Sequence, residues 1–225
     1  MFSVQVMNVG DEPSRVKISQ GDWNEDLYNR DRYFSPGALE RSGANWMMSS
    51  PESFSLRPQE TKEVRVEVTV PEDNKLSGSY WSLLFVEEES TPTKAENGQT
   101  GINTIVRYGV KVFVALENTQ IMNGAIANMS ISTAENNELL FEITFENKGN
   151  VLLHPMGYLE IRNEEGETIK DLNIDRFSVL PEHSEISKML TEKPKDVGQY
   201  TALAVLQFGA DYLVAGELVF KVVAK

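Results

Sequence analysis

The sequence predicts an all-β protein made of two β-sandwich domains in tandem. Apolar residues alternate with polar ones over short stretches, turn-forming residues separate these stretches, and one combination of strand and turn occurs twice. The chain has 225 residues, which suffices for two sandwiches of roughly 100 residues each. We find no convincing long amphipathic helix, so the alternation favours sandwiches over a helical fold.

Strand-like alternation begins at the N-terminus, where Phe2, Val4 and Val6 are separated by Ser3 and Gln5. Stretches with the same period are 64–70, 139–145 and 217–223, and a long apolar strand is expected over 102–116. Turn residues that can adopt positive φ separate the strands. They are Asn8-Val9-Gly10, Pro36-Gly37, Asn147-Lys148-Gly149, Glu165-Gly166 and Val197-Gly198.

Two local patterns occur once in each half of the chain. An alternating strand runs into Asn-x-Gly at Asn8 and again at Asn147, and Gly-x-Tyr opens an apolar strand at Gly78 and again at Gly198. We interpret the halves as two copies of one architecture. The polar stretch 117–124 interrupts the apolar pattern, so we expect domains at 1–118 and 119–225.

The halves differ at their beginnings. The second half has a strand over 125–132 ahead of the strand that reaches Asn147, whereas nothing lies ahead of Phe2 in the first half. If the two halves share a fold, the first domain lacks its opening strand. The neighbouring strand would then have an unpaired edge, which proteins seldom leave unprotected and which would also allow a homodimer.

Charge and composition exclude several classes of function. The chain has 21 Lys and Arg against 34 Asp and Glu, a net charge of −13 that repels nucleic acid and anionic lipid headgroups. The absence of cysteine excludes disulfides, thiolate zinc sites and cysteine nucleophiles. No window approaches the roughly 20 apolar residues of a membrane span, and the N-terminus lacks the features of a signal peptide.

No residue pattern predicts catalysis, a metal or a cofactor. The two histidines, His154 and His183, each lie beside turn residues and lack the spacing of metal ligands or of a catalytic triad. The chain contains neither Gly-x-Gly-x-x-Gly nor a Walker pattern for phosphate binding. We therefore expect a protein without cofactor or metal that is not an enzyme.

Three stretches of the first half together resemble a known family. They are FSVQVMNVGDEPSRVKISQGDW (2–23), SSPESFSLRPQETKEVRVEVTVPEDNKLSGSYWSLLFV (49–86) and TIVRYGVKVFVAL (104–116). In combination they look like the periplasmic chaperones that assemble bacterial pili. The resemblance implies two immunoglobulin-like domains and a periplasmic or exported protein. It also implies that the protein binds subunits of a surface fibre by β-strand addition during assembly.

The resemblance also implies client-binding residues. In that family a Lys on the last strand of the first domain and an Arg on the first strand hold the terminal carboxylate of the client subunit. Lys111 matches the Lys; the Arg has no counterpart, because the strand that should carry it is absent from this chain. The alternative is that Lys111 is a strand residue pointing to solvent.

In the same family, alternate apolar residues of that last strand insert into the client and complete its incomplete sandwich. Ile102, Thr104 and Val106 match these positions, and the alternative is that they close the core of their own domain. A second hypothesis for the whole chain is a non-catalytic structural or adhesive immunoglobulin-like module of a bacterial cell-surface assembly. Such a module would bind a protein or glycan with its loops.

Overall fold

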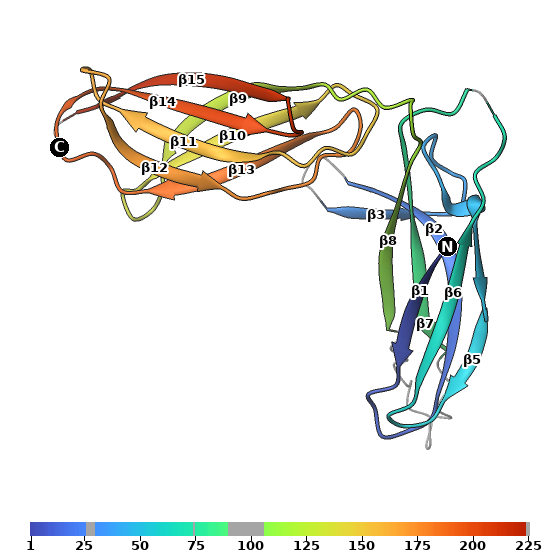
Figure 1. The fold of residues 1–225 in the computed structure, drawn as a ribbon. Helices are drawn as coiled ribbons and strands as arrows, with labels where there is room; N and C mark the ends of the chain where they lie inside the picture. Colours follow the sequence, from blue (N-terminus) through green and yellow to red (C-terminus); the bar gives the residue numbers. More distant parts are fainter. Residues whose placement is uncertain (26–29, 74, 90–105, 224–225) are drawn as a thin grey trace. The chain divides into compact units, whose positions relative to one another are not determined.

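The computed structural model describes residues 1–25, 30–73, 75–89 and 106–223, and the regular secondary structure of these ranges is almost entirely β-strand (Figure 1). The chain divides into two compact units. Unit 1 comprises Met1–Leu76 and Tyr80–Ala115, and unit 2 comprises Ser77–Ser79 and Leu116–Lys225. The expected domains, 1–118 and 119–225, stay a prediction, because a division by contacts does not test whether each part folds alone.

Unit 1 is a sandwich of two antiparallel sheets. Its elements are β1 (Phe2–Met7), β2 (Ser14–Glu25), β3 (Asp31–Phe34), the 3₁₀ helix η1 (Ala44–Trp46), β4 (Met47–Ser50), β5 (Ser53–Leu56), β6 (Thr61–Val68), β7 (Ser79–Glu88) and β8 (Arg107–Ala115). One sheet has the order β1-β6-β4, and the other follows β3-β2-β7-β8, with β5 also paired to β2. Both sheets contribute to one core, because Val64 and Val66 of β6 cluster with Ile18 of β2 and Leu84 of β7.

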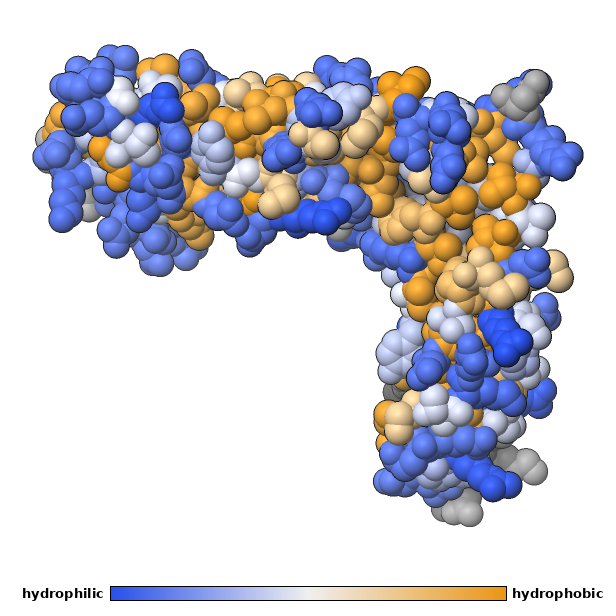
Figure 2. Space-filling view, in the orientation of Figure 1, coloured by the Kyte–Doolittle hydropathy of each residue, from blue (hydrophilic) through white to orange (hydrophobic). Residues whose placement is uncertain are grey.

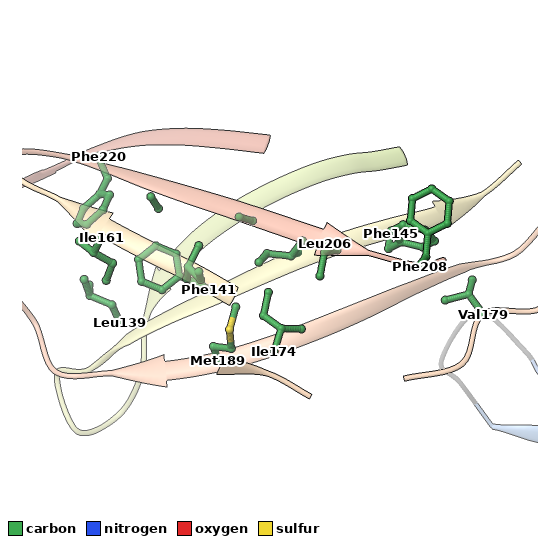
Figure 3. Packing of buried hydrophobic residues seen from close by; sticks show 14 of the residues in the cluster. Leu139, Phe141, Phe145, Ile161, Ile174, Val179, Met189, Leu206, Phe208 and Phe220 are labelled. Carbon is green, nitrogen blue, oxygen red and sulfur yellow. The ribbon is translucent and has the colours of Figure 1, made fainter. Parts of the chain in front are cut away.

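Unit 2 is also a sandwich of two antiparallel sheets, and it has a strand, β9, with no counterpart in the described part of unit 1. Its elements are β9 (Gly124–Thr133), β10 (Leu139–Asn147), β11 (Met156–Arg162), β12 (Thr168–Ile174), β13 (Ser184–Thr191), β14 (Gly198–Gln207) and β15 (Leu213–Val222). The sheets have the orders β13-β10-β9 and β12-β11-β14-β15. Figure 3 shows how Phe141, Phe145, Leu206 and Phe220 pack between strands of the two sheets, with Met189 among them.

The predicted Asn-x-Gly repeat has a side-chain basis in both units. Asn147 Oδ1 accepts a hydrogen bond from the Gly149 N–H at 2.9 Å, and Asn8 Oδ1 accepts one from the Gly10 N–H at 3.0 Å. Each asparagine also donates from Nδ2 to two backbone carbonyls. These turns are therefore closed by the asparagine side chain, whereas Gly37 and Gly166 have the expected positive φ.

The Gly-x-Tyr pattern of unit 2 carries a hallmark of immunoglobulin-like sandwiches. The Tyr200 hydroxyl, near the start of β14, donates a hydrogen bond to the Asp196 carbonyl at 2.9 Å. A tyrosine that bonds back to the backbone a few residues upstream is the tyrosine corner of that fold. The predicted all-β class and the two immunoglobulin-like sandwiches are confirmed.

Burial along β1 reflects the absence of a covering strand in the described part of unit 1. Aligned on the two asparagines, Phe2, Val4 and Val6 of β1 occupy the places of Phe141, Ile143 and Phe145 of β10. The β10 residues are fully buried, whereas the β1 residues are only partly buried at the margin of their core. In unit 2, β9 pairs with β10 along its length and covers this position. No strand in the described part of unit 1 corresponds to β9, as the sequence predicted.

The sheet β12-β11-β14-β15 is partly apolar on its outer face as well. Met156 and Tyr158 of β11 and Leu213 and Val219 of β15 are exposed. The space-filling view shows hydrophobic residues at the surface of this part of unit 2 (Figure 2). The apolar–polar alternation of these strands is therefore weaker than that of β10, and β15 begins at Leu213, four residues before the predicted stretch 217–223.

Candidate functional site

The candidate site is the open margin of unit 1 between β1 and β8. Each of these strands is the last of its sheet in the described part of the unit. In unit 2, the corresponding strands are β10 and β15, and β9 lies beside both of them, paired with β10 and in contact with β15. Unit 1 therefore has a place where an added strand can pair with an existing sheet edge.

Strand β8 presents a row of apolar side chains along this margin. Val112 is buried in the core of unit 1, Val110 is partly buried against it, and Val106 and Tyr108 are 42% and 68% exposed. All four belong to the same face of the strand, because successive side chains alternate between faces. The row thus continues from the core onto an edge that no strand covers in the described part of unit 1.

Lys111 lies on the opposite face of β8, among acidic and aromatic residues. Its Nζ lies 3.1 Å from Asp31 Oδ1 and 3.7 Å from Glu25 Oε1. The same atom lies 3.6 Å from the centroid of the Trp23 ring, a cation–π contact with a side chain that is only 2% exposed. The side chain of Lys111 itself remains 39% exposed.

These positions can be compared with the residues expected from the sequence. Val106 is exposed at the start of the apolar row, and Lys111 is paired with carboxylates instead of extending freely into solvent. Ile102 and Thr104 lie outside the described residues. Their client-binding roles, and those of Lys111 and Val106, stay predictions.

Sequence reasoning missed Tyr108 and the partners of Lys111. Tyr108 could have been found, because Val106, Tyr108, Val110 and Val112 alternate strictly along the chain. Asp31 could not, because it is 80 positions away from Lys111 and nothing in a single sequence gives the arrangement of β3 and β8.

Features that would point to other chemistry are few in the described ranges. No group of three or more His, Asp or Glu side chains there is placed to hold a metal ion. The His154 ring lies 3.1 Å from Ser178 Oγ, and partial burial together with the Arg176 charge lowers the pKa of His154. Within those ranges no helix reaches the length and hydrophobicity that a membrane crossing needs. These features leave the strand edge as the candidate site.

Comparison with known proteins gives likenesses in structure only. No family model matches the chain, and no curated protein matches it by sequence. Among solved structures, a chaperone–tip adhesin complex of CFA/I fimbriae biogenesis matches with 12% identity, a TM-score of 0.49 and coverage of 98% of this chain and 90% of that one.

Two further solved structures match this chain with similar identity, TM-score and coverage. The class 5 fimbriae chaperone CfaA matches with 13% identity and a TM-score of 0.47, covering 100% of this chain and 92% of that one. The E. coli chaperone DraB matches with 15% identity and a TM-score of 0.42, covering 96% and 90%. None of these likenesses by itself assigns a function to this chain.

Proposed function

We propose that this protein is a chaperone that binds subunits of a surface fibre by β-strand addition, with β8 as the binding strand. The observation that carries the proposal is the apolar row of β8, which continues from the core of unit 1 onto an uncovered sheet edge at Val110, Tyr108 and Val106. In strand addition, the main-chain groups of such an edge supply affinity and its alternate side chains supply specificity. The client would be a sandwich that lacks a strand of its own.

Positive charges on β8 protect this sheet edge from unwanted pairing until a client binds. Lysine and arginine on edge strands are a common protection against unwanted pairing. Arg107 forms an ion pair with Glu87 and lies 4.8 Å from the Phe85 ring centroid, and Lys111 is paired as described above. Both cations lie on the face of β8 opposite to the apolar row, so that row stays available to a client.

The finer parts of the proposal follow from the same edge. Lys111 is the proposed anchor for the terminal carboxylate of the client, because it lies on the same edge strand and its side chain is 39% exposed. A second copy of the chain could pair at the open β1 edge, which would give a homodimer in the absence of client. A fibre-assembly role places the protein in the periplasm or another exported location.

The proposal is tested by purifying the tagged protein from its own organism and determining by mass spectrometry what co-purifies. We expect one small β-rich protein at near-equal stoichiometry. The proposal also requires this partner to be an incomplete sandwich, and such a partner should be unstable when produced alone. Thermal unfolding of the isolated partner measures this. A clean monomer would contradict the chaperone function and favour the structural or adhesive module.

A further inference from the structure

The ion pairs around Lys111 join three strands of unit 1. Glu25 of β2 and Asp31 of β3 are direct cross-strand partners in the register of the two strands. Like charges directly opposite each other destabilise a pair of strands. The Lys111 ammonium lies within 4 Å of both carboxylates, at 3.1 Å from Asp31 and 3.7 Å from Glu25. One cation of β8 therefore offsets the repulsion between two anions.

The position of this ammonium is held by aromatic packing. Trp23 is buried, and the edge of its ring system meets Phe113 with ring centroids 6.1 Å apart. The Trp23 ring face lies under the Lys111 ammonium at 3.6 Å. Because the Trp23 ring is buried, its contact with the Lys111 ammonium is fixed. The contacts of the ammonium with carboxylates and with water can still change.

We infer that Glu25 and Asp31 act as an internal substitute for a client carboxylate and set how tightly Lys111 holds one. This inference rests on the proposed function of Lys111. Among the described residues, the Lys111 ammonium already lies within 4 Å of two carboxylates, so an incoming carboxylate would be a third anion beside it. A client carboxylate would therefore compete with Asp31 and Glu25 for the Lys111 ammonium.

Two consequences follow for client choice. A carboxylate gains little at this anchor in the unmodified protein, because it exchanges one ion pair for another of similar exposure. Clients would then be chosen mainly by the strand contacts of β8. Removing one acidic competitor converts the anchor into one that favours a free carboxylate.

The direct test uses sodium acetate as the probe, because acetate offers a carboxylate without a strand. The Lys111 side-chain resonances would be followed by NMR in acetate against sodium chloride at equal ionic strength. For Asp31→Asn or Glu25→Gln we expect acetate to bind about 1.4- to fivefold more tightly than to the unmodified protein, the factor that one exposed ion pair of about 0.2–1 kcal/mol would give.

The matched control is Glu67→Gln, which removes the same charge from an exposed strand position of β6. Its acetate affinity should equal that of the unmodified protein. The inference is overturned if neither Asp31→Asn nor Glu25→Gln binds acetate more tightly than Glu67→Gln. The two single variants are tested separately, so that misfolding of one does not remove the test.

A second measurement separates this inference from the proposed function. The co-purified client is compared on the Asp31→Asn/Glu25→Gln variant with and without Lys111→Met, because in that background Lys111 no longer offsets the two carboxylates. Loss of client capture on adding Lys111→Met supports Lys111 as the anchor. Unchanged capture would overturn the anchoring role of Lys111 in the proposed function, even if acetate binds as expected.

Discussion

Replacing Asn147 by alanine is expected to lower the free energy of unfolding of unit 2 by about 2–4 kcal/mol, because buried groups would lose their hydrogen-bond partners. Asn147 is fully buried. Its side chain donates to the Val151 and Val179 carbonyls at 2.8 and 2.9 Å and accepts from the Gly149 N–H. Urea unfolding followed by far-UV circular dichroism measures the loss.

Asn8→Ala is the matched control, because Asn8 makes the equivalent contacts in unit 1. Asn8 is only partly buried, so water can replace some of the lost partners, and we expect a loss of about 0.5–1.5 kcal/mol. All three tryptophans lie in unit 1, so tryptophan fluorescence follows that unit separately. Equal losses for the two variants would contradict the burial difference between the units.

Tyr108→Glu is expected to reduce client capture by at least about tenfold, because tyrosines at the centre of an interface commonly contribute 2 kcal/mol or more to binding. Tyr108 is the most exposed member of the apolar row of β8, so its replacement should leave the stability of unit 1 nearly unchanged. The measurement is the yield of co-purified client per mole of tagged protein.

Val219→Glu provides the comparison for that experiment. It introduces the same charge at an exposed apolar position of β15, the end strand of unit 2 that corresponds to β8. This variant should capture as much client as the unmodified protein. If both variants lose the client equally, β8 is not the specific binding strand.

Much of the fold could be predicted because strands and turns depend on residue patterns that are local in the sequence. The alternation of Phe2, Val4 and Val6 and the two Asn-x-Gly turns each involve residues close together in the chain. The same local signals predicted the strand at 125–132, which has no counterpart in the described part of unit 1. Those predictions required no knowledge of which strands pair.

The environment of Lys111 could not be predicted for the opposite reason. The ion pairs with Glu25 and Asp31 depend on the register of β2 with β3 and on the place of β8 in the sheet. The burial of Asn147 likewise depends on Val179, which is 32 positions away. A single sequence contains the residue types of these contacts but not the distances between them.

Hydrogen–deuterium exchange on the free protein and on the complex with its co-purified client tests strand addition most directly. We expect backbone amides of β8, over Arg107–Ala115, to gain protection in the complex, because an added strand pairs with the edge of this sheet. The amides of β15, the equivalent end strand of unit 2, should exchange at unchanged rates. Unchanged exchange in β8 together with new protection elsewhere would contradict the account.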